Sequence, residues 1–416
     1  MTSQLQRIVD DIGSRLQRAA AIDDTSLRIQ VYSPHFGPVD ETRLASILQR
    51  RAPGEARSWV ESLGIASSNT AMRVPANNDL GFLPRICAPI RFQDVHLGYL
   101  WLIDADETLT DADLEQAQEA ADRAAVLMYR GQLLEQLERG RERELLRDVL
   151  SGDAALAGHA ATQLVEEDLF VRGAKPAALA VRLLVDPDTT IADRERVTMD
   201  AVLESARGRL SARHAVQLVR PDHGVLVFAS NDRALRQDGP AGFAQGIHRM
   251  LSTRLPDVLR IVIGIGDPQP TLQDTGASYR QAMRATEVVR IVPSFGDVGT
   301  WSTFGIYRTL SQLPPAELRS DALHPGLLRL LEDESHWGLV ATLEAYLDNA
   351  GDAKVTADAL GIHRTSLYYR LNRIAELADV DFKKGEDRLA LHLGLKMARL
   401  GGLWDDERAR RSLTSK

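Results

Sequence analysis

Residues 352–378 read DAKVTADALGIHRTSLYYRLNRIAELA, and the interpretation of the whole chain depends on this stretch. Its first part predicts a short helix over residues 354–360, followed by Gly361 at a corner where the backbone often needs a positive φ. Ala357 presents a small side chain that lets a second helix cross closely. That second helix is predicted over residues 363–378, because apolar side chains recur in it at three- and four-residue spacing. They are Leu367, Leu371, Ile374 and Ala378. The stretch therefore predicts a helix-turn-helix.

The opposite face of the second helix carries hydroxyl and cationic side chains, and no acidic residue lies between His363 and Arg373. Arginine can bond to guanine O6 and N7, small hydroxyls can bond to phosphate or base edges, and tyrosine can reach the DNA backbone. We therefore expect this face to contact the major groove of double-stranded DNA; the alternative is an ordinary solvated face of a small helical domain. The candidate DNA-contacting residues are Arg364, Thr365, Ser366, Tyr368, Tyr369, Arg370 and Arg373.

The segment TADALGIHRTSLYYRLNRIAELADVDFKKGEDRLALHLGLKMARL, residues 356–400, resembles the C-terminal helix-turn-helix of the PucR/CdaR family of bacterial transcriptional regulators. It is also similar to the DNA-binding region of Fis. The matching residues are Thr356-Ala357, Leu360, His363-Arg364, Tyr369-Arg370-Leu371, Arg373-Ile374 and Glu386-Asp387-Arg388-Leu389. One departure is Thr365-Ser366, where the family commonly has Asn-Thr.

This resemblance implies a sequence-specific DNA-binding transcriptional regulator, controlled by a small-molecule effector and acting on catabolic or secondary-metabolism genes. It adds Thr356 and His363 to the candidate DNA-contacting residues.

Composition limits the class of protein. The chain has 416 residues, 44% of them apolar, which suggests two to four globular domains with sizeable cores. It contains no apolar run long enough for a membrane span and no signal-peptide core at its N-terminus, so we expect a cytoplasmic protein. The single cysteine, Cys87, rules out an internal disulfide and a thiolate metal cluster. A formal net charge of −8 means that any DNA binding depends on a local basic face.

Residues 1–130 are predicted to form an α/β sensor domain. An amphipathic helix opens it, and strands are expected over residues 27–32, 85–92 and 97–103, with helical structure over residues 41–63. The last two strands alternate like a hairpin with one covered face. Followed by a long helix, they resemble the end of a GAF domain, which implies a small-molecule pocket. Its candidate ligand-binding residues are Trp59, Cys87, Tyr99 and Trp101, with ordinary core packing as the alternative for each.

Residues 110–150 are predicted to form one long connecting helix that begins with the capping box Thr110-Asp111-Ala112-Asp113. Gly131 and Gly140 interrupt its apolar pattern, which favours a short dimer seam over a sustained coiled coil.

Residues 154–298 are predicted to form a second α/β domain, which resembles the degenerate GGDEF-like domain of CdaR-type regulators. The turn Pro221-Asp222-His223-Gly224 replaces the glycine-rich acidic hairpin that cyclase chemistry requires, so we expect a non-catalytic domain. Gly264 and Gly266 follow a strand without the third glycine of a nucleotide-binding loop, and we interpret them as a turn. Neither a P-loop nor a hydrolase motif occurs. The sequence therefore predicts no enzyme activity, no cofactor and no metal.

The remaining divisions are a proline-containing connector at residues 301–334, the DNA-binding domain at residues 336–402 and a charged tail at residues 403–416. A closing helix over residues 387–400 is expected to bury Leu389, Leu393, Met397 and Leu400. The overall fold class is multidomain α/β plus all-α: a GAF-like sensor, a connecting helix, a GGDEF-like domain and a helix-turn-helix bundle.

We expect the chain to act as a homodimer or higher homo-oligomer on operator DNA with inverted half-sites, and to respond to an unknown small-molecule effector. Two alternatives remain at this point. One is a degenerate nucleotide-binding or signalling enzyme of the GGDEF type. The other is an adaptor that uses its helical tail to bind protein or RNA.

Overall fold

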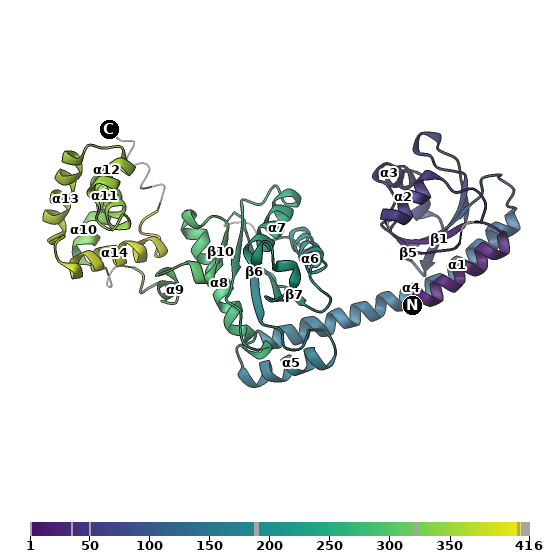
Figure 1. Ribbon diagram of the computed structural model, residues 1–416, viewed down its shortest axis with the longest axis horizontal. Helices are drawn as coiled ribbons and strands as arrows, with labels where there is room; N and C mark the ends of the chain where they lie inside the picture. Colours follow the sequence, from purple (N-terminus) through teal and green to yellow (C-terminus); the bar gives the residue numbers. More distant parts are fainter. Residues whose placement is uncertain are drawn as a thin grey trace. The chain divides into compact units, whose positions relative to one another are not determined.

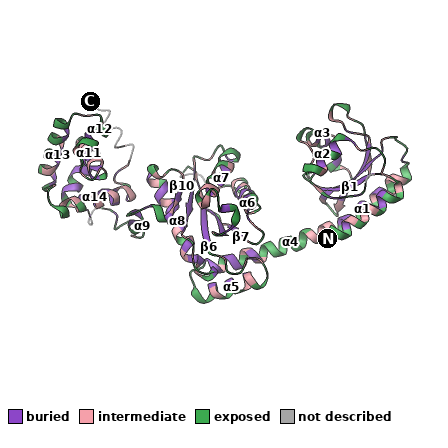
Figure 2. Ribbon diagram, viewed as in Figure 1, coloured by how far each residue is buried: buried purple, intermediate pink, exposed green. Residues whose placement is uncertain are grey.

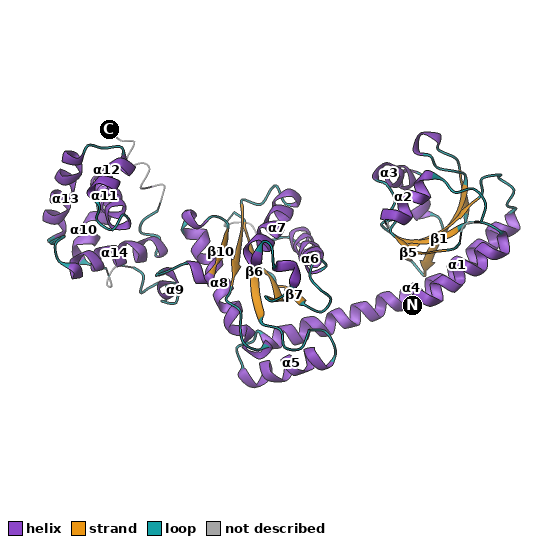
Figure 3. Ribbon diagram, in the orientation of Figure 1, coloured by secondary structure: helices purple, strands orange, loops and turns teal. Residues whose placement is uncertain are grey.

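A computed structural model describes residues 2–34, 36–49, 51–186, 191–319, 323–405 and 408. The chain divides into two compact units, Met1–Gly140 and Arg141–Lys416. Each unit contains one five-stranded sheet, and the C-terminal part of the second unit is helical (Figures 1 and 3). This arrangement confirms the predicted mixture of α/β and all-α structure. Among the described residues, none of the helices is both long and apolar enough to span a membrane.

The sheet of the first unit is antiparallel throughout, with the strand order β2-β1-β5-β4-β3. Its elements are α1 (Thr2–Leu16), β1 (Ala20–Asp24), β2 (Ile29–Tyr32), α2 (Glu41–Gln49), α3 (Gly54–Ser62), β3 (Met72–Val74), β4 (Arg85–Phe92) and β5 (Val95–Ile103). The expected hairpin is present, and β1 is a strand that the sequence pattern did not predict. The helical stretch expected over residues 41–63 is two helices, because Pro53 lacks an amide hydrogen and disfavours helical structure before it.

Both faces of this sheet are covered, so the prediction of one covered face was wrong. Ile86 and Leu100 belong to a core shared with α1 and α4 (Asp111–Val149). Cys87 and Trp101, directly opposite each other in the β4–β5 ladder, belong to a second core on the other face. A strand buried on both faces loses the polar alternation that marks a half-covered hairpin.

Helix α4 confirms the predicted long helix. The Thr110 backbone N–H and hydroxyl both donate to Asp113 Oδ2, at 2.7 Å each, which closes its N-terminus. The helix continues across the boundary between the two units, and its last turns pack in the second unit through Leu145, Leu146 and Val149.

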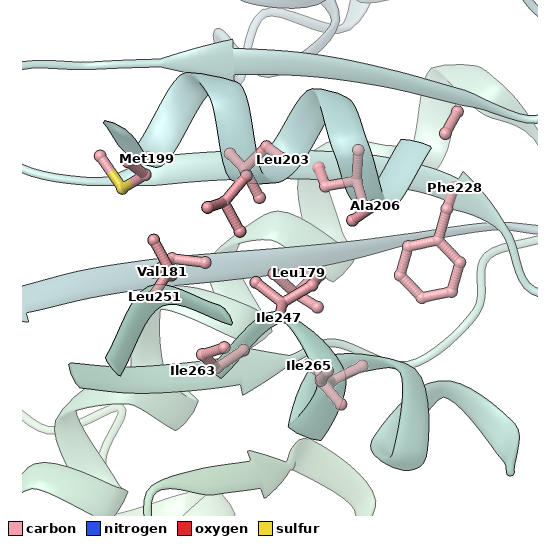
Figure 4. Close-up of a cluster of buried hydrophobic side chains, with 14 of the residues drawn as sticks. Leu179, Val181, Met199, Leu203, Ala206, Phe228, Ile247, Leu251, Ile263 and Ile265 are labelled. Carbon is pink, nitrogen blue, oxygen red and sulfur yellow. The ribbon is translucent and has the colours of Figure 1, made fainter. Parts of the chain in front are cut away.

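The sheet of the second unit has the order β10-β9-β6-β8-β7, in which only the β10–β9 pair is parallel. Its strands are β6 (Pro176–Leu184), β7 (Ala215–Val219), β8 (Gly224–Ala229), β9 (Arg260–Ile265) and β10 (Val298–Thr300). Helices α6 (Asp193–Arg207) and α7 (Gly239–Arg254) bury apolar side chains against one face, as Figure 4 shows for Leu203, Leu251 and Ile263. Helices α5 (Ala154–Glu166) and α8 (Thr275–Ile291) cover the other face.

Gly264 and Gly266 lie where α8 approaches the sheet. A Cβ at Gly264 would stand 2.1 Å from the Ala282 carbonyl oxygen, and one at Gly266 would stand 2.0 Å from the Ser278 carbonyl oxygen. Gly264 is inside β9, so interpreting this pair as a turn was wrong. The glycines are needed because any side chain would collide with the backbone of α8.

The helical region has a single apolar core built by α10 (Pro325–Glu332), α11 (Trp337–Asp348), α12 (Ala353–Leu360), α13 (Arg364–Ala378) and α14 (Gly385–Leu400). Helix α10 contributes Leu327, Leu330 and Leu331, although these residues fall in the stretch expected to be a connector. Beyond α14, Trp404 also enters this core, whereas residues 406–407 and 409–416 of the expected charged tail lie outside the described residues.

The buried face of α14 differs from the predicted one. Leu389 is 66% exposed, while Leu391, Leu395, Met397 and Ala398 are buried. Leu393 and Leu400 are only partly buried. The predicted and the observed sets of residues both have helical spacing. Which set is buried depends on where the neighbouring helices lie.

Candidate nucleic-acid interface

The corner between α12 and α13 is built from short local contacts. Asp352 caps α12 by accepting hydrogen bonds from the backbone N–H groups of Lys354 and Val355, and these bonds lower the pKa of its carboxyl. The helix ends at Gly361, whose φ of 62° and ψ of 33° place it in the left-handed region. The predicted corner and its need for a positive φ are confirmed.

Helix α13 is held by the apolar stripe expected from its sequence. Leu367, Leu371, Ile374 and Ala378 are all buried, and they pack in the helical core together with Ala357 of α12. Because these residues fix the inner face, the opposite side of α13 is left at the surface of the bundle (Figure 2).

Most of the predicted contact residues lie on that outer side. Tyr368 is 55% exposed and Tyr369 is 74% exposed, so both tyrosines present aromatic surface to the solvent. The other exposed candidates are Arg364, Thr365, Ser366 and Arg373. Their outward cations and hydroxyls are the groups that bond to phosphates and base edges.

Arg370 is placed differently from the other arginines. It is half-buried, and its Nη1 donates a hydrogen bond to the hydroxyl of Thr342 at 3.0 Å. Thr342 is fully buried on α11, so this bond ties α13 to the bundle. Arg373 instead pairs with Glu376 of its own helix at 3.1 Å, where both side chains remain exposed.

Thr356 and His363 have contacts within the motif. The Thr356 side chain is buried, and its hydroxyl donates to the Asp352 carbonyl oxygen at 2.6 Å. His363 is the N-cap of α13, and its Nδ1 lies 2.8 Å from the Thr365 hydroxyl oxygen. Thr356 therefore does not face solvent, whereas His363 remains exposed beside the first turn of the helix.

Asn372 belongs to the same outer surface but was not predicted. It is exposed, and it stands three residues after Tyr369 and seven after Thr365, which places all three on one side of a helix. An asparagine amide can bond adenine through two hydrogen bonds. Its helical position was a sequence signal that could have identified it.

The helix-turn-helix matches a known family. The model of the PucR C-terminal helix-turn-helix domain matches residues 339–397, which include α12 and α13. We refer to residues 339–397 as the PucR domain because of this similarity. The model of the GGDEF-like domain matches residues 175–288, within the second unit.

Similarity to regulators extends beyond the PucR domain. The proline-responsive transcriptional activator PutR of Bacillus subtilis (strain 168) is 21% identical over 95% of this chain and 96% of that protein. The DNA-binding transcriptional activator AdeR of the same organism is 21% identical over 95% of this chain and 93% of that protein. The carbohydrate diacid regulator of Escherichia coli (strain K12) is 39% identical over 71 residues, 17% of this chain and 18% of that protein. These matches confirm the predicted resemblance to PucR/CdaR-type regulators.

The turn between β7 and β8 is closed by side-chain contacts. His223 is buried, its Nδ1 lies 2.8 Å from Asp222 Oδ1, and its Nε2 lies 2.8 Å from the Tyr279 hydroxyl. Burial lowers the pKa of His223, although the hydrogen bond to Asp222 opposes this effect. Among the described residues, no group of three or more His, Cys, Asp or Glu side chains is arranged to hold a metal.

The candidate ligand-binding residues of the first unit share one apolar cluster. Cys87, Tyr99 and Trp101 are buried in it, and Trp59 is partly buried against it. The Tyr99 and Trp101 rings lie 5.8 Å apart, and Trp59 reaches the cluster through Phe82, at a centroid distance of 4.8 Å.

Asp23 is a buried carboxyl near this cluster that sequence reasoning missed. Burial raises its pKa to about 7, and the Arg85 guanidinium offsets only part of that rise.

Gly361→Val is expected to destabilise the corner and weaken DNA binding by the PucR domain. Apart from its two chain neighbours, no described residue has a heavy atom within 4 Å of a Cβ at this position, so the effect comes from backbone conformation and not from a collision. A β-branched residue at this φ costs about 1–2 kcal/mol, and relaxing it changes the angle between α12 and α13.

The matched control for this prediction is Gly361→Asn, because asparagine tolerates the left-handed region better. Thermal melting and DNA binding of the full chain should both be close to wild type for asparagine and reduced for valine. Equal behaviour of the two variants would contradict a role for the positive φ.

Proposed function

We propose that this protein is a sequence-specific DNA-binding transcriptional regulator that acts in the cytoplasm. The observation that carries the proposal is the orientation of α13: its apolar stripe is buried, and exposed cationic, hydroxyl and tyrosine side chains occupy the other side. The similarity of nearly the whole chain to PutR and AdeR, both transcriptional activators, supports the same function.

Within the motif we assign different roles to the candidate residues. Arg364, Arg373 and Asn372 are proposed to contact bases or phosphates, because their side chains are exposed on the outer side of α13. Arg370 is proposed to position α13 through Thr342. Thr356 is left out of the interface, since its buried hydroxyl is bonded within α12. The remaining proposed contacts are His363, Thr365, Ser366, Tyr368 and Tyr369.

The direct test of the function is selection of genomic DNA by the purified full-length protein, followed by footprinting at physiological salt. We expect protection of a defined sequence with inverted half-sites, their centres about 34–36 Å apart or a multiple of that distance. Failure to protect any duplex above non-specific competitor DNA would overturn the proposal.

We further propose that α4 holds a homodimer. Val126, Leu133, Leu134 and Leu137 are large apolar side chains on this helix, and all are at least 45% exposed. Their clustering within about three turns favours a short seam over a sustained coiled coil. Because the whole protein carries a formal net charge of −8, one PucR domain should bind a half-site weakly, and two such domains on one operator would combine their contacts.

Leu134→Glu is expected to weaken the dimer, because association would bury an unpaired carboxylate in the seam. We expect the dimer dissociation constant to rise at least tenfold, about 1.4 kcal/mol. Sedimentation of the full chain over a concentration series measures this shift. Gln136→Glu adds the same charge at an exposed polar position of α4 and should leave association unchanged. Unaltered association of Leu134→Glu would contradict the seam.

The first unit is proposed to be a GAF-like sensor of a small-molecule effector, with Trp59, Cys87, Tyr99 and Trp101 as its candidate ligand-binding residues. We propose residues 154–298 as a non-catalytic GGDEF-like domain between this sensor and the PucR domain. An effector can shift a conformational equilibrium only by binding one state more tightly. It would therefore act by favouring one arrangement of the two PucR domains in the dimer.

A further inference from the structure

A basic pocket lies between the GGDEF-like domain and the residues that follow it. One helical stripe of α8 forms its floor, with Arg280, Gln281 and Arg284 at the spacing that places side chains on one side of a helix. The opposing wall comes from the segment around α9 (Tyr307–Leu310), which contributes Arg308 and Thr309. The remaining lining residues are Ala277, Trp301, Gly305 and Gln312.

Apolar packing fixes the two walls of the pocket against each other. Trp301, Phe304 and Tyr307 are buried in one cluster with Val288 and Val289 of α8. The guanidinium of Arg308 lies 5.8 Å from the Trp301 ring centre, which restrains that arginine through a cation–π contact. The basic side chains are therefore held on rigid elements and not on a free loop.

The charge of this pocket is the reverse of the charge of the whole protein. Its lining contains three arginines and no acidic residue, whereas the chain has a formal net charge of −8. Arg308 lies 3.9 Å from the carboxylate of Asp267. Throughout the described ranges, the Arg280 and Arg284 guanidiniums have no hydrogen bond or ion pair. Arg280 and Arg284 stand four residues apart on α8, and like charges at this spacing repel each other unless an anion neutralises them.

An arginine guanidinium can donate two parallel hydrogen bonds to the oxygen atoms of one phosphate group. Each of these charged hydrogen bonds is stronger than a neutral one. The pocket has a volume of about 540 Å³, which is more than an inorganic phosphate needs and falls in the range of small-molecule sites. Neutral polar groups from Gln281, Thr309 and Gln312 can bond to further oxygens.

We propose that the pocket formed by Arg280, Arg284 and Arg308 binds a small molecule bearing two or more linked phosphate groups, such as a nucleoside polyphosphate. This site is separate from the candidate effector residues of the first unit and from α13. The regulator would then respond to a second small molecule, bound by residues between its GGDEF-like domain and its PucR domain.

The test is calorimetric titration of the purified full-length protein with pyrophosphate, ATP and citrate at matched ionic strength. We expect pyrophosphate and ATP to bind, and citrate, which carries comparable charge without phosphates, to bind at least about tenfold more weakly. Removing both α8 cations in Arg280→Gln/Arg284→Gln should weaken pyrophosphate and ATP at least about tenfold. Arg249→Gln removes one exposed arginine from α7, outside the pocket, and should change neither affinity.

The double variant should fold normally, because the structure shows no bonds of Arg280 or Arg284 that it would break among the described residues; equal melting of variant and wild type checks this. The proposal is overturned if pyrophosphate and ATP do not bind, if citrate binds as tightly as they do, or if the double variant binds like wild type. Loss of DNA affinity with unchanged pyrophosphate binding would also overturn it, and would assign the pocket to the DNA backbone.

Discussion

Leu371→Asp is expected to unfold the helical bundle that carries α13 while the unit Met1–Gly140 stays folded. Leu371 is only 6% exposed and packs in the single apolar core of the bundle. Truncating a core leucine costs about 2–5 kcal/mol, and burying a carboxylate without a partner adds to that cost. The sum approaches the whole stability of a typical domain, about 5–15 kcal/mol.

Thermal unfolding of the full chain measures this effect, with the first unit as an internal reference. Asn372→Asp is the matched control, because it adds the same charge one position further along α13 at an exposed site. We expect the bundle transition to disappear for Leu371→Asp and to shift only slightly for Asn372→Asp. An unchanged bundle transition in Leu371→Asp would contradict the buried stripe of α13.

Arg364→Ala is expected to lower operator affinity strongly without unfolding the protein. The side chain is exposed at the first turn of α13, so its removal leaves the apolar core intact. A lost base contact costs about 1–3 kcal/mol and relaxes sequence preference, whereas a lost phosphate contact weakens all sequences and reduces the salt slope by about one. In a two-fold dimer both subunits carry the substitution, so the loss of binding free energy is counted twice.

Arg373→Ala is expected to lower operator affinity in the same way. The loss should be smaller than for Arg364→Ala, because Arg373 already pairs with Glu376 in the free protein. Arg370→Ala should differ, because it breaks the bond to buried Thr342 and should lower the melting temperature as well as the affinity. Fluorescence anisotropy with operator and scrambled DNA over a salt series separates these outcomes. The control is Arg249→Ala, which removes an exposed arginine from α7. Unchanged operator binding by both Arg364→Ala and Arg373→Ala would show that α13 is not the recognition helix.

Local patterns in the sequence predicted much of this architecture. The spacing of Leu367, Leu371, Ile374 and Ala378 identified the buried side of α13, because side chains three and four residues apart share one face of a helix. The position of Gly361 identified the corner for an equally local reason, since only its own φ and ψ decide the fit. The resemblance to PucR/CdaR-type regulators depended on the same short segment.

The tertiary structure decided which of two similar stripes is buried and what each polar side chain contacts. Leu389 and Leu391 both fit a helical pattern, but only Leu391 meets the other helices of the bundle. The helical position of Arg370 predicted an exposed side chain. In the structure, however, Arg370 donates a hydrogen bond to Thr342, which is distant in the sequence. The sequence by itself determined the helix-turn-helix and the α/β units, because these depend on neighbours along the chain. Only the folded structure determined the two covered sheet faces, the anchoring of Arg370 and the convergence of Arg280 and Arg284 with Arg308, because these depend on packing between distant segments.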